Sequence, residues 1–373
     1  MNTAFDKPTR QQREYLLHRL AQDYRDLNGT EVEVWTHTPS PLEFAKIASI
    51  GRPVLLRNTP GKTELPALTK WSDEYLFASM GERKLSVAVT PNGRADSLHT
   101  LSDGTRYFVE PHTERMTIHE LFQAIARSEQ VRQPTLFFAS CVPTEPLYAR
   151  SQDPSSEVYY LQSQNGNMFN AADFESPSPP VDSSSSELAP QLLADVPREI
   201  PWASGALGRA PDAVNIWIGG SRSVTSVHSD PYENVYAVIR GSKHFTLLPP
   251  TEGYTLREQR VPHAKYTRPS PESSLQVEPI AGSYVRWAEV DPALLTISDA
   301  EIGAPMRVTV KAGEALYLPA GWWHHVAQSG GGVNGVCVAV NWWYDVEMRG
   351  MIWTWMAFLR RMGAPDGDED EDV

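Results

Sequence analysis

Thr225-Ser226-Val227-His228-Ser229-Asp230 is the stretch of this sequence that decides its fold, and Leu316-Tyr317-Leu318-Pro319-Ala320-Gly321-Trp322-Trp323-His324-His325 completes it. On a strand, side chains two positions apart point to the same face, so His228 and Asp230 can enter a barrel interior together. Two imidazoles and one carboxylate form a facial set that suits iron(II) and leaves the other face open. The two stretches therefore predict a metal centre inside a β-barrel.

The tandem His324-His325 leaves one choice open. Neighbouring residues on a strand face opposite sides, so only one of these histidines should be a ligand, and spacing alone does not say which. A single His-x-Asp is usually a coincidence, and tryptophans such as Trp322 and Trp323 are more often core residues. The metal hypothesis therefore depends on polar residues in the surrounding strands.

Four polar residues strengthen it. Lys243 lies between apolar runs at 238–239 and 245–248, where a buried cation can pair with an acidic ligand. Thr225 and Asn234 add hydrogen-bonding groups close to His228 in the chain. Asn341 lies inside the apolar run 336–343 and is either a satisfied core residue or part of the same site. Together they indicate an acidic ligand beside the metal.

Short strands fill the second half of the chain. Apolar runs with Gly or Pro between them predict strands at 214–218, 223–230, 235–240, 244–248, 306–310, 315–318 and 335–343. A content of 30 Pro, 24 Gly and 11 Trp also favours a turn-rich β fold over a helical bundle. We expect a mainly β protein, built as a sandwich or a barrel. Residues 252–305, which include part of the pocket rim, receive no element assignment.

Helices are expected before and after these strands. Apolar residues at helical spacing predict helices at 11–28 and 346–362. Ser40-Pro41-Leu42-Glu43 and Thr117-Ile118-His119-Glu120 are capping boxes that open helices at 41–49 and 118–127. Further strands are predicted at 53–57, 85–90, 135–141 and 158–162.

These elements suggest an organisation in four parts. An N-terminal α+β elaboration at 1–130 packs on a core at 131–345, followed by a C-terminal helix within 346–365 and an acidic disordered tail at 366–373. Within the core, a Pro-Ser-Pro-Pro run and four consecutive serines predict a mobile insertion at 172–200.

Charge and cysteine content exclude several classes of protein. The formal net charge is −13, and six acidic residues in 366–373 leave −7 for the rest of the chain. No basic stripe indicates nucleic-acid binding, whereas a mildly acidic body is compatible with a basic protein substrate. Two cysteines, Cys141 and Cys337, exclude a disulfide framework and fit a reducing compartment. Neither a secretory signal nor a transmembrane helix is expected.

At these residues the sequence resembles the Jumonji C (JmjC) family of iron- and 2-oxoglutarate-dependent oxygenases, and within it the small protein-hydroxylase branch. The shared stretches are 86–91, 158–162, 201–204, 211–215, 224–226, 232–234, 243–245, 316–320, 339–341 and 343–345. The resemblance implies a double-stranded β-helix core, also called a jelly-roll or cupin fold, with flanking helices. It also implies that His228, Asp230 and His324 bind Fe(2+), because the first histidine of the tandem is the ligand in this family.

The resemblance further implies a 2-oxoglutarate pocket. Its distal carboxylate would be bound by Tyr160, Thr225 and Lys243, with Asn234 and Asn341 beside the metal-chelating end. Tyr159 remains an alternative to Tyr160, because a shift of one residue in register exchanges the two. The serine-rich insertion, residues 145–157 and the acidic tail depart from the family pattern.

The implied reaction uses 2-oxoglutarate and O2 as co-substrates, hydroxylates C-3 of a lysine in a protein, and releases succinate and CO2. In the most similar members the substrates are developmentally regulated GTP-binding proteins. Alternatives are hydroxylation of Asn, Asp, His or Arg, and N-methyl-lysine demethylation, including histone-directed activity. A non-catalytic cupin scaffold is a further alternative, against which the intact triad argues. No protease constellation is visible.

Partners and location follow from the same resemblance. A homodimer through the C-terminal helix is favoured, with Trp353, Trp355 and Phe358 as contacts. No nucleic acid or membrane partner is expected. The location is expected to be cytoplasmic, with the nucleus as a second site.

Overall fold

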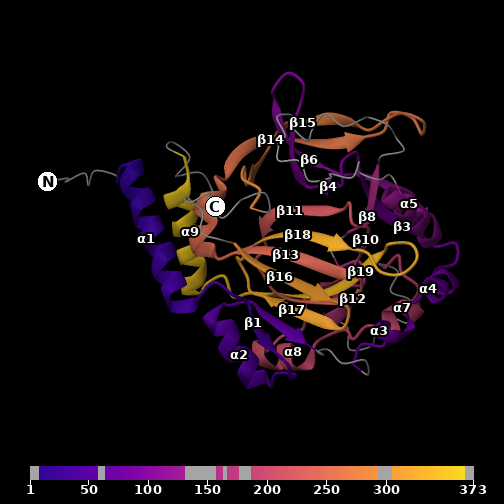
Figure 1. The fold of residues 1–373 in the computed structure, drawn as a ribbon, viewed down its shortest axis with the longest axis horizontal. Coiled ribbons are helices and arrows are strands. Elements are labelled where there is room, and N and C mark those ends of the chain that lie inside the picture. Colours follow the sequence, from indigo (N-terminus) through magenta and orange to yellow (C-terminus); the bar gives the residue numbers. More distant parts are fainter. Residues whose placement is uncertain are drawn as a thin grey trace, which may run out of the picture.

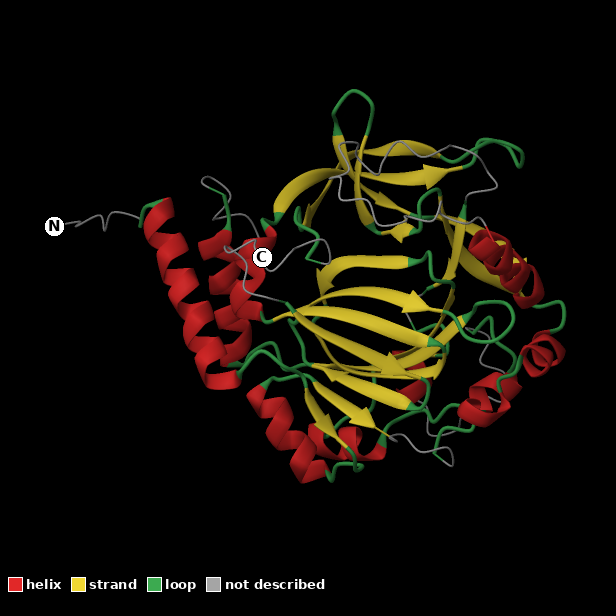
Figure 2. Cartoon of the chain, viewed as in Figure 1, coloured by secondary structure: helices red, strands yellow, loops and turns green. Residues whose placement is uncertain are grey.

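The computed structural model describes residues 8–57, 64–130, 157–162, 166–175, 186–292 and 305–365. Strands form three sheets, and helices lie around them (Figure 1, Figure 2). The strand predicted at 135–141, the serines at 183–185 and the acidic tail lie outside the described residues. No described helix is both long enough and apolar enough to cross a membrane.

The largest sheet has ten strands in the order β1-β2-β17-β12-β19-β10-β8-β3-β7, with β9 paired to β10. These strands are β1 (Glu33–Trp35), β2 (Val54–Arg57), β3 (Lys84–Thr90), β7 (His112–Thr117), β8 (Val158–Leu161), β9 (Phe169–Asn170), β10 (Ala213–Gly219), β12 (Tyr232–Arg240), β17 (Glu314–Leu318) and β19 (Cys337–Asp345). The region 1–130 therefore supplies strands at both ends of the sheet.

A second sheet of five strands faces the middle of the first. Its order is β16-β13-β18-β11-β4, with β4 (Arg94–Ala95), β11 (Val224–Ser229), β13 (Ser242–Leu248), β16 (Met306–Lys311) and β18 (Trp323–Ser329). Apolar side chains of both sheets meet between them, including Val238 of β12 and Phe245 and Leu247 of β13. The expected double-stranded β-helix core with flanking helices is confirmed, and these two sheets are called the barrel below.

A third sheet of four strands lies over the β11 side of the barrel (Figure 1). Its order is β15-β14-β6-β5, with β5 (Ser97–Thr100), β6 (Arg106–Glu110), β14 (Gln259–Thr267) and β15 (Gln276–Trp287), and it is called the overhanging sheet below. The segment 252–305, left unassigned from sequence, begins within the 3-10 helix η3 (Pro250–Leu256), and its described part contains the strands β14 and β15. Its strand pattern is weak because no residue of β15 is buried, so this strand lacks an apolar face.

The helices begin largely where capping predicted. They are α1 (Arg10–Asn28), α2 (Pro41–Ile50), α3 (Ala67–Lys70), α4 (Asp73–Met80), α5 (Ile118–Gln130), α6 (Ala171–Glu175), α7 (Pro190–Ala194), α8 (Pro201–Leu207) and α9 (Met351–Gly363). The Ser40 and Thr117 boxes are both formed by reciprocal hydrogen bonds. The last helix begins at Met351 rather than at 346, because Gly350 takes an extended conformation with ψ 156° and acts as the N-cap.

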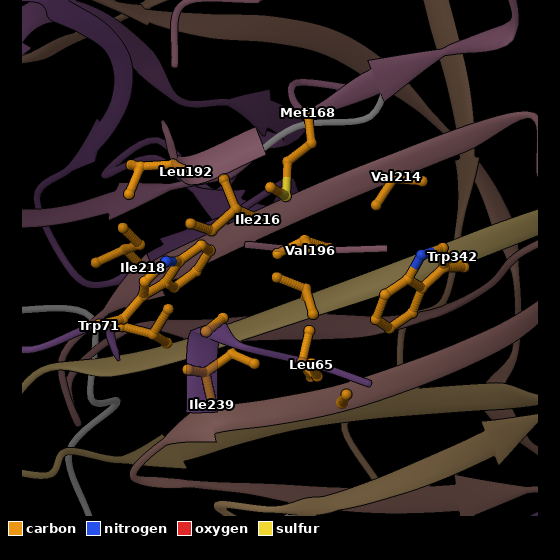
Figure 3. Packing of buried hydrophobic residues seen from close by; sticks show 14 of the residues in the cluster. Leu65, Trp71, Met168, Leu192, Val196, Val214, Ile216, Ile218, Ile239 and Trp342 are labelled. Carbon is orange, nitrogen blue, oxygen red and sulfur yellow. The ribbon is translucent and has the colours of Figure 1, made fainter. Parts of the chain in front are cut away.

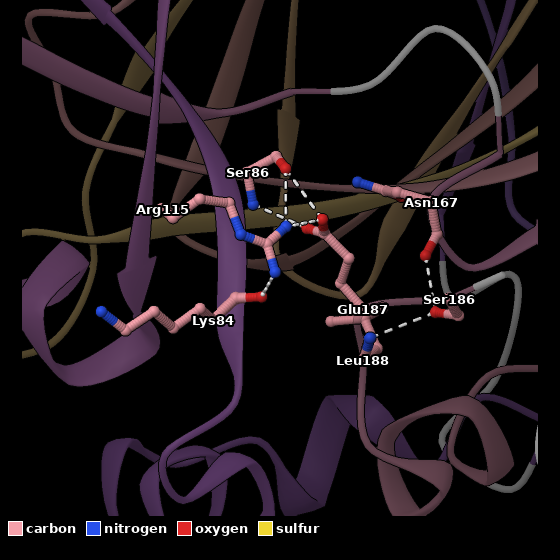
Figure 4. A network of polar contacts seen from close by, with 7 residues as sticks. All are labelled: Lys84, Ser86, Arg115, Asn167, Ser186, Glu187 and Leu188. Carbon is pink, nitrogen blue, oxygen red and sulfur yellow. Dashed lines mark hydrogen bonds and ion pairs between the residues drawn. The ribbon is translucent and has the colours of Figure 1, made fainter. Parts of the chain in front are cut away.

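The mobile insertion predicted at 172–200 contains buried and hydrogen-bonded residues in its described part. Leu188 and Leu192 are buried in the main apolar core. Glu187 accepts hydrogen bonds from the backbone N–H and the hydroxyl of Ser86, at 2.6 and 2.8 Å, and pairs with Arg115 (Figure 4). The serine composition concealed these anchors, because apolar and acidic residues follow directly after the serines.

The main core lies between the largest sheet and the short helices on its outer side. Val214, Ile216 and Ile218 occupy one face of β10 and pack near Trp71 and Trp342 (Figure 3). Because side chains alternate along a strand, the residues between them face the barrel interior. One face of β10 thus stabilises the fold, and the other is available for the site.

Candidate metal centre and its cavity

His228, Asp230 and His324 come together at one end of the barrel. β11 and β18 are antiparallel neighbours, and the register places His228 opposite His324. The Nε2 atoms of His228 and His324 lie 3.7 and 3.6 Å from the two carboxylate oxygens of Asp230. The ligand atoms of the three residues all lie within 4.8 Å of one another. This grouping could hold one metal ion.

Hydrogen bonds prepare both histidines to be ligands. The Nδ1 atom of His228 lies 2.8 Å from the carbonyl of Ser226, and that of His324 lies 2.9 Å from the carbonyl of Trp322. A carbonyl can only accept, so each Nδ1 carries the proton and each Nε2 keeps its lone pair for a metal. Burial, helped by the neighbouring His228, lowers the pKa of His324 to about 4, so its ring is neutral near pH 7. Two neutral imidazoles and one carboxylate fit an iron(II)-type donor set.

His325 lies on the other face of β18. It is paired in register with Thr246 of β13, and its Nε2 lies 3.8 Å from a carboxylate oxygen of Asp291. Asp291 also pairs with Arg94 at 3.0 Å. The structure thus brings His324, and not His325, to the other two members of the triad.

Lys243 places a buried cation inside the barrel. Its side chain is only 2% exposed, its Nζ donates to the hydroxyl of Tyr160 at 3.2 Å, and it lies 5.1 Å from the centre of that ring. Within the described ranges no carboxylate forms an ion pair with it. A buried ammonium without an anion is costly, so this position fits a ligand that carries a carboxylate.

Tyr160, and not Tyr159, is the tyrosine at Lys243. It pairs with Gly219, where a Cβ atom would come within 2.6 Å of the Tyr160 ring, so glycine is needed there. Tyr159 instead donates to Glu157 at 3.2 Å. Thr225 is half-buried on β11, and the register is irregular between it and His228. Residues three positions apart on a regular strand face opposite sides, but this irregularity means that Thr225 and His228 need not do so.

A chain of hydrogen-bonded, buried amide side chains links β12, β19 and β10. Asn341 donates to the side-chain oxygen of Asn234 at 3.1 Å, and its own oxygen accepts from Asn215 at 3.3 Å and from the indole of Trp217 at 2.8 Å. Asn341 is therefore a satisfied core residue, which was one of the two interpretations that the sequence left open. Sequence reasoning missed Asn215 and Trp217, although a polar residue inside the apolar run of β10 was a usable signal.

The overhanging sheet adds an aromatic residue that sequence reasoning also missed. The ring of Trp287, at the end of β15, stacks on His228 with ring centres 6.4 Å apart and an angle of 7°. On another side, a cavity bounded by Tyr254 of η3 and Met356 of α9 reaches Asp230. The candidate centre therefore lies between the barrel, the overhanging sheet and the C-terminal helix.

Comparisons with known proteins agree with this geometry. The family model described as a cupin-like domain matches residues 39–350. A human protein named bifunctional peptidase and (3S)-lysyl hydroxylase JMJD7 is 36% identical over 313 residues, covering 83% of this chain and 82% of that protein. An Arabidopsis thaliana protein named lysine-specific demethylase JMJ32 is 33% identical over 347 residues, covering 89% and 87%. A Dictyostelium discoideum protein named JmjC domain-containing protein E is 27% identical over 340 residues, covering 86% of each chain.

Proposed function

The chain belongs to the cupin-like JmjC oxygenase family, and on that basis we propose that it is an Fe(II)- and 2-oxoglutarate-dependent protein hydroxylase acting at C-3 of a lysine. One observation supports the proposal most strongly: the triad with inward Nε2 atoms and the buried cation Lys243 belong to the same barrel. A metal and a carboxylate-bearing co-substrate would satisfy both at once.

Each residue then has a definite task. His228, Asp230 and His324 would hold iron(II) on one face, which leaves the opposite face open. Iron(II), with 2-oxoglutarate and O2, supplies the oxidising power for hydroxylation of an unactivated C–H bond, with succinate and CO2 as co-products. Lys243 would anchor the distal carboxylate as a charge-assisted pair, and the Tyr160 hydroxyl, which accepts from Lys243, would donate to the same carboxylate.

The amide chain would fix the position of the co-substrate. Asn234 and Asn341 are held by each other and by Asn215 and Trp217, so they cannot rotate freely. Groups that are already ordered lose little entropy when a ligand binds. Trp217 and Trp343 cover the same wall with aromatic surface, ring centres 6.3 Å apart, which would exclude water from the reacting atoms.

The lysine target is supported by two observations. The human relative carries lysyl hydroxylase in its name. The chain itself is acidic, with a net charge of −13, which favours approach of a basic protein segment. Developmentally regulated GTP-binding proteins are the substrates that we would assay first.

The test incubates the protein with Fe(II), 2-oxoglutarate, O2 and a purified GTP-binding protein of that class. We expect succinate release and a mass increase of one oxygen on one lysine. The Asp230→Ala variant supplies the background, because it removes the charged ligand. Succinate no higher than that background, with fully loaded metal, would refute the hydroxylase. Succinate release with oxygen on a residue other than lysine would refute only the lysyl target.

A second candidate is removal of a methyl group from N-methyl-lysine, which the name of the Arabidopsis relative favours. Both reactions begin with hydroxylation, but a hydroxylated N-methyl group breaks down to formaldehyde. A formaldehyde assay with N-methyl-lysine peptides therefore separates them. Formaldehyde in amounts equal to succinate would replace the C-3 proposal.

We also propose a homodimer through α9. Its outer face exposes Met351, Ile352, Trp355 and Phe358, which form a continuous apolar stripe. Trp353, expected as a contact, instead borders the cavity beside Asp230. Light scattering should give the mass of a dimer, and exchanging Trp355 and Phe358 for serine should give a monomer. A monomeric unaltered protein would refute the dimer.

A further inference from the structure

Asp96 lies where the chain passes from the barrel to the overhanging sheet. It follows β4 and precedes β5, and β4 pairs in parallel with β11, with Ala95 opposite Thr225. Its φ of 50° is in the left-handed region, which aspartate and asparagine tolerate better than most residues. Asp96 therefore lies at the junction of the barrel and the overhanging sheet, directly after the strand that neighbours the one carrying His228.

The carboxylate of Asp96 has a neutral partner only. Gln162 donates to it at 3.1 Å, and in the described part of the chain no Lys, Arg or His forms an ion pair with it. Burial raises the pKa of Asp96, and the nearby Glu110 raises it further, against the effects of Gln162, His228 and His263. A buried carboxylate is normally paired with a cation, and the described residues do not supply one to Asp96.

Glu110 supplies a second carboxylate close by. It ends β6 of the overhanging sheet, and one oxygen lies 3.1 Å from Nε2 of His263 on β14. Its side chain remains 47% exposed, so it is reachable from outside. Ala95, directly before Asp96, lies opposite Thr225 on β11, the strand that also carries His228, so Asp96 is on the side of the overhanging sheet that is near the candidate metal centre.

Aromatic rings lie beside the candidate metal centre. Trp287 stacks on His228, and Phe108 contacts Trp287 with ring centres 4.5 Å apart. The His263 ring lies 5.6 Å from Phe108. A row of rings therefore leads from the metal ligand to the histidine that Glu110 contacts. Apolar rings that lead to carboxylates suit a side chain with an apolar stem and a cationic end.

We propose that Asp96, assisted by Glu110, binds the ammonium group of the substrate lysine while the methylene stem packs on Trp287 and Phe108. This makes Asp96 a specificity-determining residue, and the inference rests on the proposed function above. In lysine, three methylene groups separate the carbon proposed for hydroxylation from the ammonium. A carboxylate set beside the metal, rather than at it, can therefore hold the cation while C-3 faces the metal. The same carboxylates would repel an aspartate target.

The test is Asp96→Asn, which keeps the shape and tolerates the same backbone conformation, so folding should be preserved. The probes are two peptide mixtures of random sequence, one with lysine and one with norleucine fixed at the centre. Norleucine has the apolar stem without the charge. Loss of one charge-assisted contact should raise the KM for the lysine mixture about tenfold or more and leave that for norleucine unchanged. The kcat should change little.

Matched variants separate direct binding of the ammonium by Asp96 from the effect of a change in the overall charge of the protein. Glu278→Gln, on the exposed part of β15, makes the same charge change and should have no effect. Glu110→Gln should give a smaller rise in the same direction. Turnover of 2-oxoglutarate without peptide should be unchanged in Glu278→Gln. An unchanged preference for lysine over norleucine in both Asp96→Asn and Glu110→Gln would overturn the inference.

A binding measurement keeps the two proposals apart. The affinity of each peptide mixture is measured without O2, with Mn(II) and 2-oxoglutarate present, so no turnover is needed. If the unaltered protein prefers lysine and Asp96→Asn does not, the inference holds even where succinate assays fail. If succinate forms but neither binding nor turnover depends on Asp96, the inference fails and the hydroxylase stands. Thermal unfolding of each variant verifies that it is folded. If Asp96→Asn does not fold, the result for Glu110→Gln decides whether the inference holds.

Discussion

The barrel and the overhanging sheet form two walls of one site, but their residues are held very differently. On the barrel side, Lys243 and Asn341 are almost fully buried and have fixed hydrogen-bond partners. On the overhanging side, Glu110 is half exposed and no residue of β15 is buried. The barrel therefore offers rigid positions, as a metal and a small co-substrate need, whereas the other wall offers accessible charge for a protein substrate.

A buried apolar cluster and two ion pairs connect the two walls, with Val89 of β3 packed against Val109 of β6 and Ala264 of β14. Arg268, directly after β14, pairs with Glu114 of β7 at 2.9 Å and with Glu157 before β8 at 2.7 Å. β4 leads directly into β5 through Asp96. A sheet with exposed strands opens more easily than a buried core. We therefore expect changes in the barrel to abolish chemistry and changes in the overhanging sheet to alter substrate choice.

The largest effect should come from the histidine tandem. His324→Ala removes a ligand and should weaken Mn(II) binding by at least about a hundredfold, more than the loss of an outer hydrogen bond usually does, and turnover should disappear. His325→Ala, its immediate neighbour, should keep the metal affinity, since His325 faces Asp291. Electron paramagnetic resonance of Mn(II) measures both. Equal loss of metal in the two variants would mean that the triad is assigned wrongly.

Lys243→Met should have the next largest effect, on the co-substrate. Loss of a buried charge partner should raise the KM for 2-oxoglutarate by about thirtyfold or more. Because the ammonium has no anionic partner in the described chain, methionine should not lower the midpoint of thermal unfolding. Lys311→Met, on the exposed edge strand β16, is the matched control. A normal KM, or a large drop in the unfolding midpoint, would make Lys243 structural instead.

The third largest effect is the tenfold rise in the KM for lysine peptides that we expect for Asp96→Asn, and it tests the overhanging sheet rather than the barrel. It should alter lysine selectivity without altering metal or 2-oxoglutarate binding. A loss of metal affinity in that variant would mean that the two walls are not independent.

The smallest effect should concern stability alone. Burial raises the pKa of Glu233 from 4.5 to about 7, although Tyr317 donates a 2.6 Å hydrogen bond to it. Between these values the folded protein keeps a proton that the unfolded chain has released. The contribution of protonated Glu233 to stability is therefore complete below pH 4.5 and is lost as the pH rises through about 7. The free energy of unfolding should fall by up to about 3 kcal/mol over that range.

Glu233→Gln should remove this pH dependence and leave turnover unchanged. Urea denaturation at several pH values measures it, with the exposed Glu74→Gln as the control. A slope that persists in Glu233→Gln would assign the titration to another group.

Sequence reasoning was most successful where the pattern is local. Period-two alternation correctly predicted that His228 on β11 and Asp230, just after that strand, lie together, and the capping boxes located α2 and α5. It was least successful from 252 to 292, where exposed strands lack an apolar period, and at 186–200, where serine composition concealed buried leucines. Trp287 and Asp96 gave no local signal, since each depends on a partner far away in the chain.

The sequence by itself determined the donor set, the mainly β core and the buried position of Lys243, because each depends on residues close together in the chain. Only the tertiary structure decided that His324 rather than His325 joins His228, that Tyr160 reaches Lys243, and that Asp96 lies near the metal centre. The physical reason is that strand alternation fixes the face of a side chain, whereas the pairing of distant strands fixes what that face meets.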